Sequence, residues 1–182
     1  MKLFEKTIEV ENVYSGKILE LTREKAELEN GSVAYREVVH HSGGVCVVAL
    51  TDKNEVLMVR QFRYPFKEVL LEVPAGKREK GEDPLQCGIR ELKEECGAEA
   101  EKIIPLGRLY PTVAYDTEVI YMYLATGLSF GEQSLDDDEF LEAERIPLDE
   151  ACRMVMEDKI PDSKTQLALL KAQKLIGSMS ER

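Results

Sequence analysis

The sequence predicts a mixed-sheet fold of the α+β or α/β class, preceded by a small antiparallel sheet. The first 41 residues contain only strand-like runs in which apolar and polar residues alternate. From residue 44 onward, strand-like and helical patterns follow one another in one continuous segment without internal repeats. We therefore expect an N-terminal antiparallel β unit at residues 1–42 and a main domain at residues 43–182.

The N-terminal unit should consist of three strands joined by tight turns. The alternating apolar pairs are Ile8 and Val10, Leu19 and Leu21, and Val33 and Tyr35. Asn30-Gly31 separates the last two runs and is typical of a two-residue hairpin turn with positive φ angles. Three such strands are too few to be robust alone, so we expect this unit to pack across a two-fold axis in a homodimer. Packing against its own main domain is the alternative.

The main domain should alternate strands and helices. Expected strands are 45–50, 55–62, 68–73, 102–110, 118–126 and 141–146, and expected helices are 84–96, 148–157 and one from about 164. A loop should span residues 74–83. Ser163 followed three residues later by Gln166 predicts the cap of the last helix.

Composition excludes several classes of protein. The chain has 182 residues, 43% of them hydrophobic, and a formal net charge of −11 from 24 Lys+Arg and 35 Asp+Glu. This acidity opposes binding to nucleic acid or to an anionic membrane. The longest apolar run, 45–50, is far too short to span a bilayer, and residues 1–16 lack the apolar stretch of a signal peptide. We expect a soluble, cytoplasmic protein.

The four cysteines form no metal-binding or redox pattern. Cys46, Cys87, Cys96 and Cys152 include no C-x-x-C pair, and the only histidines are His40 and His41. We expect reduced thiols that pack as small core residues.

The helix at 84–96 can be derived from its ends. Asp83 suits the N-cap, Pro84 suits the first helical position, and Gly97 suits a left-handed stop. A stripe that recurs at helical spacing should pack on the sheet; its members are Leu85, Ile89, Leu92 and Cys96.

Two glutamates lie beside that predicted stripe. With Leu85 at 0°, Glu91 falls at about 240° and Glu95 at about 280°, one turn apart, and Gly88 at about 300° leaves space near them. Arg90, at about 140°, should face away from both. A hard divalent cation such as Mg²⁺ or Mn²⁺ would offset the repulsion between the carboxylates. A solvated acidic helix face is the alternative.

The segment around this helix resembles a complete Nudix box. It reads Gly76, five residues, Glu82, seven residues, and then Arg90-Glu91-Leu92-Lys93-Glu94-Glu95-Cys96-Gly97-Ala98. The resemblance implies the Nudix fold, an α/β/α sandwich of the α+β class with a mixed sheet between helices. It also implies hydrolysis of a nucleoside diphosphate linked to another moiety.

By position, the resemblance assigns roles to individual residues. The carboxylates of Glu91 and Glu95 and the backbone carbonyl of Ala75 would bind the metal, expected to be Mg²⁺ with Mn²⁺ as a substitute. Glu82 and Arg90 would hold the loop and the helix in register.

An acidic loop and a third box glutamate complete the catalytic candidates. In the family, a glutamate on the loop before the last strand serves as general base or metal ligand, which points to Glu139, with Asp138 next. A solvated linker is the alternative interpretation of this run. Glu94 would be an auxiliary ligand or support, so Glu139, Glu94 and Glu95 are the catalytic candidates.

Flanking motifs resemble the ADP-ribose pyrophosphatase group of this family. They are residues 60–64, 71–76, Pro111, 14–17, 36–39 and 162–165. This resemblance implies hydrolysis of ADP-ribose to AMP and ribose 5-phosphate, and it supports a homodimer. Some of the motifs are shared with hydrolases of other nucleoside diphosphate sugars, including GDP-mannose.

The resemblance also indicates substrate contacts. Arg63 and Glu72 would contact the terminal ribose or the phosphates, Glu118 a ribose hydroxyl, and Arg36 the nucleotide. For each residue, a surface salt bridge is the alternative. The group often has a glycine-containing pair after the proline, whereas this chain has Thr112-Val113-Ala114-Tyr115, which weakens the case for ADP-ribose. Tyr115 could stack on a ligand or pack in the core or rim.

Two further functions compete with this one. A non-catalytic module that senses a nucleotide sugar has no need for two repelling carboxylates, so the intact pair argues against it. Hydrolysis of oxidised nucleoside triphosphates is disfavoured by the extra N-terminal sheet and by the motif at 60–64.

Overall fold

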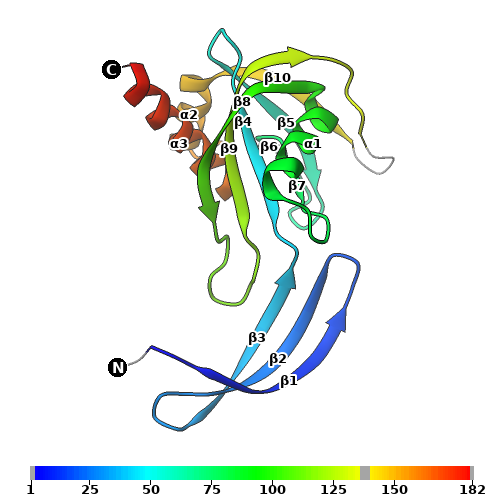
Figure 1. Cartoon of the computed structure of the whole chain (residues 1–182), viewed down its shortest axis with the longest axis vertical. Helices are drawn as coiled ribbons and strands as arrows, with labels where there is room; N and C mark the ends of the chain where they lie inside the picture. Colours follow the sequence, from blue (N-terminus) through cyan, green and yellow to red (C-terminus); the bar gives the residue numbers. More distant parts are fainter. Residues whose placement is uncertain (1–2, 136–139, 181–182) are drawn as a thin grey trace. The chain divides into compact units, whose positions relative to one another are not determined.

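The computed structural model describes residues 3–135 and 140–180. The chain divides into two compact units, whose elements are labelled in Figure 1. The N-terminal unit comprises Met1–Gly43 together with Tyr110–Val119, and the main unit comprises Gly44–Leu109 together with Ile120–Arg182. The segment 110–119, expected in the main domain, thus clusters with the N-terminal residues.

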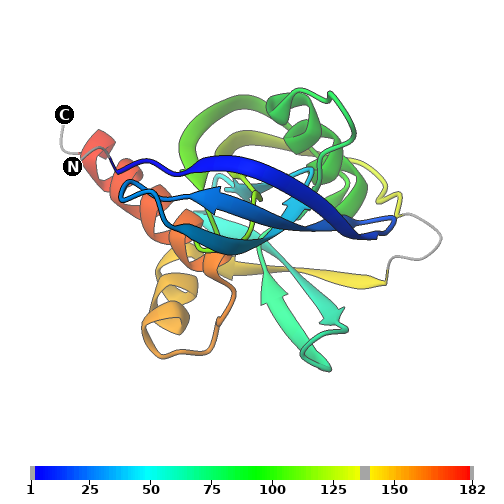
Figure 2. The same ribbon diagram turned by 90° about the horizontal axis from the view of Figure 1, so that it is seen from below.

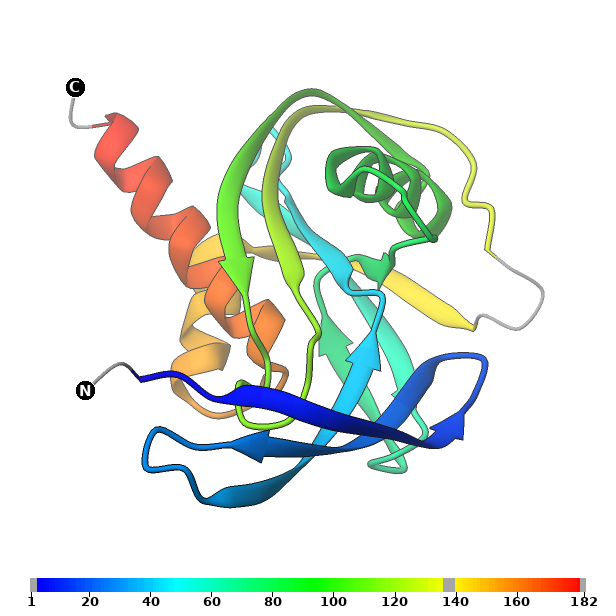
Figure 3. The same ribbon diagram turned by 60° about the horizontal axis from the view of Figure 1, so that its bottom comes forward.

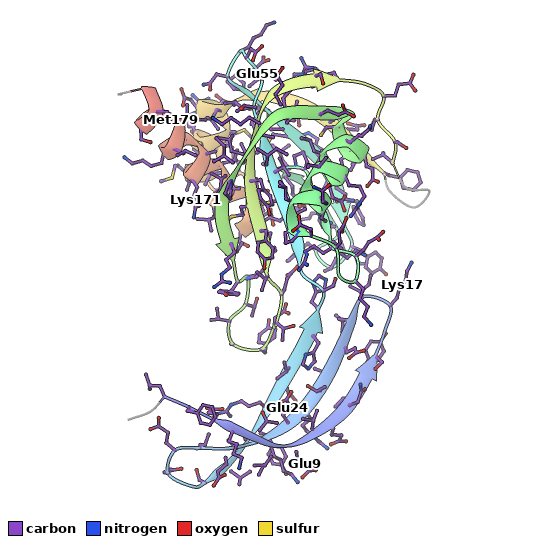
Figure 4. All side chains as sticks on the ribbon, in the orientation of Figure 1. Glu9, Lys17, Glu24, Glu55, Lys171 and Met179 are labelled. Atoms are coloured by element: carbon purple, nitrogen blue, oxygen red, sulfur yellow. The ribbon has the colours of Figure 1, made fainter. Side chains whose placement is uncertain are left out.

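The N-terminal unit contains the expected three-stranded antiparallel sheet. Its strands are β1 (Lys6–Ser15), β2 (Leu19–Glu27) and β3 (Val33–His41), in the order β1-β2-β3. Backbone hydrogen bonds from Val39 to Tyr115 (2.7 Å) and from Thr117 to Val39 (2.9 Å) attach the segment 110–119 to β3. Figure 4 shows side chains projecting from these strands, among them Glu9 of β1 and Glu24 of β2.

The turn between β2 and β3 is longer than the predicted two-residue turn. Gly31 adopts a positive φ of 80°, but Asn30 does not. The backbone N–H of Leu28 donates to Ser32 O at 2.8 Å, which closes a five-residue loop. The Asn30 side chain accepts from the Ser32 N–H at 3.0 Å, so the asparagine stabilises the loop through its side chain rather than through a left-handed backbone.

The main unit contains two sheets with a mixed strand arrangement. The four-stranded sheet has the order β7-β4-β9-β8, formed by Ala75–Lys77, Gly44–Ala49, Ile120–Phe130 and Ala98–Leu109. Only β4 and β9 pair in parallel among these described strands. The antiparallel second sheet has the order β10-β5-β6, formed by Leu141–Pro147, Glu55–Arg63 and Glu68–Glu72. The predicted strands are present, but β7 lies in the expected loop, β8 begins four residues earlier than predicted and β9 ends four residues later.

Helices cover both faces of the four-stranded sheet. Alternate residues of β4 point to opposite faces, so Val45 and Val47 pack with Leu92 of α1 (Pro84–Cys96), whereas Cys46 and Val48 pack with Leu169 of α3 (Ser163–Ser180). Figure 3 shows α1 across the sheet from the other helices, and Figure 2 shows α2 (Leu148–Met156) beside α3. This is the expected α/β/α sandwich. None of the described helices is long and apolar enough to cross a membrane.

Helix α3 is capped one residue earlier than predicted. Asp162, not Ser163, accepts a hydrogen bond from the Thr165 N–H through Oδ2 at 3.0 Å. The Gln166 side chain donates to Ile160 O at 2.6 Å instead of closing a capping box with Ser163. Aspartate and serine are comparable N-caps, and the aspartate lies where the chain enters the helix.

The four cysteines are free thiols, as expected. Cys46, Cys87 and Cys152 are buried and Cys96 is half-buried. Burial raises the pKa of Cys46 to about 12, so this thiol stays protonated at neutral pH.

Candidate active site

Helix α1 begins and ends as its sequence predicts. Asp83 Oδ1 accepts from the backbone N–H groups of Leu85 (2.9 Å) and Gln86 (3.2 Å). Gly97 stops the helix in the left-handed conformation, with φ of 59°. These caps fix the length of the helix and therefore place the glutamates of its last two turns.

The face that α1 buries differs from the predicted apolar stripe. Leu85 and Ile89 are 37% and 38% exposed, whereas Glu91 and Glu95 are only 6% and 2% exposed. The buried face is therefore centred on the two glutamates, and the leucine and isoleucine lie at its margin. Polar partners in the main unit compensate for this burial, which an apolar interior could not do.

The first of these partners is the backbone of β7. The Ala75 N–H donates to Glu95 Oε2 at 2.9 Å. At Gly76, an added Cβ would lie only 1.9 to 2.2 Å from the carboxyl atoms of Glu91. The strand thus brings Ala75 against one carboxylate, and the missing side chain of Gly76 makes room for the other.

Arg90 contacts three carboxylates, and one of them belongs to Glu91, from which its position on the helix predicted that it faces away. Its Nη1 lies 2.9 Å from Glu91 and 2.8 Å from Glu94, and its Nε lies 3.0 Å from Glu82. The long side chain lets the guanidinium return across the helix surface, which a wheel of Cα positions does not show. The Glu82–Arg90 pair that the family resemblance implied is present, and its hydrogen bond holds the pKa of Glu82 at about 2.

The donors near α1 fit a hard divalent cation. Glu91, Glu95 and the neighbouring Ala75 backbone offer only oxygen ligands for a metal, and Gly76 keeps the space beside Glu91 clear of a side chain. Within residues 3–135 and 140–180, no three His, Cys, Asp or Glu side chains are arranged to hold a metal ion. Mg²⁺ commonly binds through one or two carboxylates and completes its shell with water and substrate phosphates, so two carboxylates suffice.

Arg63, which is partly exposed, forms an ion pair with the buried Glu72. Arg63 donates to both carboxylate oxygens of Glu72, at 2.6 and 2.7 Å, and Glu72 is 1% exposed. Lys164 also donates to Glu72. Burial alone would raise the pKa of Glu72, but Arg63 and Lys164 together hold it below its ordinary value. Glu72 is therefore ionised and enclosed by cations.

The other predicted substrate residues belong to the N-terminal unit. Arg36 makes a bidentate pair with Glu5 at 2.9 and 2.7 Å, on the surface. Glu118 Oε1 lies 3.3 Å from His41 Nδ1. Tyr115 is exposed, which excludes core packing for its side chain. Val113 is also exposed, and neither it nor Ala114 adopts a positive φ.

The base candidates Glu139 and Asp138 lie outside the described residues.

Sequence reasoning missed contacts made by the start of α3. Thr165 is fully buried, and its Oγ1 accepts from the Val73 N–H at 3.0 Å. The motif at 162–165 could have pointed to these contacts, but the family resemblance gave its residues no individual roles.

A protein-family comparison identifies the chain. The NUDIX domain model matches residues 40–170, which include the Gly76–Ala98 segment with Glu91 and Glu95. The chain belongs to the Nudix family. Members of this family generally use divalent metal ions.

Similar proteins agree with the family assignment. The chain is 43% identical over 171 residues to the methanol dehydrogenase activator of Bacillus methanolicus, covering 92% of each chain. It is 41% identical over 169 residues to the ADP-ribose pyrophosphatase of Bacillus subtilis (strain 168), covering 92% of this chain and 91% of the relative. A solved structure titled as an ADP compounds hydrolase has a TM-score of 0.85 at 20% identity, over 96% of this chain and 95% of the other, which confirms the fold.

The contact between Gly76 and Glu91 generates the first prediction. In Gly76→Ala, the new methyl group would displace the Glu91 carboxylate, and misplacement by about 1 Å can lower kcat by about 10²-fold. The rate should be measured with saturating substrate and Mg²⁺, and the fold checked by circular dichroism.

Gly88→Ala is the matched control, because Gly88 lies beside Val47 and Tyr123 rather than leaving space for the glutamates as its position on the helix predicted. Its Cβ would meet Val47 and Tyr123 at 3.4 Å or more, which is ordinary contact, so kcat should stay within about twofold. Equal activity of the two variants would show that the space at Gly76 does not position Glu91.

Proposed function

We propose that this Nudix hydrolase cleaves the diphosphate of ADP-ribose to give AMP and ribose 5-phosphate, with Mg²⁺ as cofactor and Mn²⁺ as a substitute. The observation that carries the proposal is the buried Glu91 and Glu95 pair, placed against Ala75 and Gly76. It occurs in a chain 41% identical to the Bacillus subtilis ADP-ribose pyrophosphatase. The methanol dehydrogenase activator similarity does not select a substrate.

The residues of this chain would hold the cation and the loop beside it. Glu91, Glu95 and the Ala75 carbonyl would bind Mg²⁺, and Glu94 would support the set as an auxiliary ligand. When bound, Mg²⁺ polarises phosphoryl oxygens and lowers the pKa of a bound water. Arg90 pairs with Glu91 and Glu94, so it limits the repulsion between these two carboxylates within the helix.

In the main unit, the proposed cation for substrate recognition is Arg63. Arg63 donates hydrogen bonds to Glu72 through Nε and Nη2. Its third guanidinium nitrogen, Nη1, has no hydrogen bond to the described residues. That nitrogen is suited to a phosphate oxygen. In the N-terminal unit, Arg36 would contact the nucleotide in exchange for its ion pair with Glu5, and Glu118 would contact a ribose hydroxyl in exchange for its contact with His41.

Hydrolysis of another nucleoside diphosphate sugar, such as GDP-mannose, is the alternative substrate assignment. A non-catalytic sensing module is disfavoured, because burying two carboxylates side by side costs stability that sensing alone does not require.

A panel of nucleotide sugars tests the proposal. ADP-ribose, GDP-mannose and similar substrates are incubated with Mg²⁺, and release of the nucleoside monophosphate is measured. ADP-ribose should have the highest kcat/KM, EDTA should abolish turnover, and Glu95→Gln should lower kcat by about 10³-fold or more with the fold intact. Tenfold preference for GDP-mannose would replace the substrate assignment, and EDTA-resistant turnover would refute the metal role.

The role of Glu139 is tested separately. As the proposed general base, it should contribute mainly in the transition state, where a positioned base is worth about 10²- to 10⁴-fold in kcat. Glu139→Gln should lower kcat by that factor with little change in KM, and Asp136→Asn should be nearly silent. If both variants are equally mild, Glu94 or Asp138 becomes the candidate, whereas a raised KM or weaker metal binding would identify Glu139 as a ligand.

We also propose that the protein is a homodimer. Strand β1 is an edge strand with Ile8, Val10, Val13 and Tyr14 all exposed, an apolar surface that a second copy could cover. Light scattering at micromolar concentration should give twice the chain mass, and Val10→Glu should shift the protein toward monomer, whereas Glu9→Gln should not. A monomeric wild-type protein at that concentration would overturn this proposal.

A further inference from the structure

Lys164 is a partly buried cation at the start of α3. Its side chain is 13% exposed and donates to Glu72 and, at 3.0 Å, to Asp162 Oδ2. Burial alone would lower its pKa, but the charges of Asp162 and Glu72 keep the pKa above the ordinary value. Lys164 is therefore a charged group that the metal chemistry of α1 does not use.

Glu72 connects Lys164 to Arg63. The carboxylate accepts two hydrogen bonds from Arg63 and one from Lys164, and it is almost completely enclosed. A bidentate pair fixes the plane of a guanidinium, so the orientation of Arg63 follows that of the Glu72 carboxylate. The ammonium of Lys164, held in turn by Asp162, fixes one oxygen of that carboxylate.

This network adjoins the carboxylates of α1. Glu72 lies three residues before Ala75, whose N–H donates to Glu95. The hydrogen bond with Glu72 raises the pKa of Arg63, and the charges of Asp162 and Glu95 add to this effect. A diphosphate bound beside Glu95 would therefore lie near the segment that carries Glu72, the carboxylate partner of Arg63.

We propose that Lys164 is a positioning residue for substrate binding, which holds Glu72 so that Arg63 presents its Nη1 edge to the diphosphate. This inference rests on the proposed function of the α1 site. Lys164 also balances charge: Arg63 and Lys164 supply two positive charges against two negative charges on Glu72 and Asp162. Without the Lys164 ammonium, Arg63, Glu72 and Asp162 would carry a net charge of −1 beside an anionic substrate. The Glu72 carboxylate would then have no second cation to fix its position.

Lys164→Met tests the inference by steady-state kinetics on ADP-ribose. KM should rise by about tenfold or more and kcat should fall by less than about threefold, because Arg63 binds the substrate rather than the reacting water. Lys164→Arg keeps the charge and should restore KM to within about threefold of wild type. Lys174→Met removes another lysine of the same helix, away from Glu72, and should leave KM and kcat unchanged. Unchanged KM in Lys164→Met would overturn the inference.

A double-mutant cycle separates positioning from a general loss of stability. If Lys164 acts through Glu72, the KM of Glu72→Gln combined with Lys164→Met should be no higher than that of Glu72→Gln alone. Additive effects on KM would show that Lys164 acts by another route. Thermal unfolding of each variant shows whether the protein measured is folded.

A substrate-free measurement keeps the inference separate from the proposed function. The Arg63 Nε–H resonance, assigned by its loss in Arg63→Lys, should shift or broaden in Lys164→Met and stay in place in Lys174→Met. Absence of ADP-ribose turnover by wild type would refute the proposed function and leave this readout intact. An unchanged Arg63 resonance in Lys164→Met would refute the positioning role whatever the substrate.

Discussion

The burial of two carboxylates on α1 is the constraint on which the site depends. An ionised carboxylate taken out of water is costly unless hydrogen bonds or cations replace its hydration. Here the Ala75 N–H supplies one bond to Glu95, and Arg90 supplies a charge to Glu91. Because the face that carries the glutamates points toward these partners, Leu85 and Ile89 are left partly exposed to solvent.

Both helical layers and the sheet hold the segment 72–76. From β4, the Val47 N–H donates to Pro74 O at 2.9 Å. From α3, Thr165 accepts from Val73, and from α1, Glu95 accepts from Ala75. Consecutive backbone groups are therefore bound by different layers, so the position of the Ala75 backbone depends on packing throughout the main unit.

The sequence predicts the parts of this arrangement that local chemistry determines. The Asp83 cap, the Gly97 stop and the strands on either side of α1 follow from short-range patterns. The Nudix resemblance adds the prediction that Glu91 and Glu95 are metal ligands. The rotation of α1 does not follow, because apolar periodicity selects Leu85 and Ile89 while the sheet offers partners for glutamates. The Glu72–Lys164 contact joins residues 92 apart in the chain, a separation at which no local pattern operates.

The charge distribution explains why an acidic protein would require a cation for an acidic substrate. Near the segment 72–76 and the face of α1, the cations Arg63, Lys164 and Arg90 form ion pairs with carboxylates. They are paired with five carboxylates, those of Glu72, Asp162, Glu82, Glu91 and Glu94, so these paired groups sum to 3 − 5 = −2. Because each fixed cation already has a carboxylate partner, these residues alone would repel a diphosphate. Positive charge from a divalent metal would then be needed for the substrate to bind as well as for the reaction to proceed.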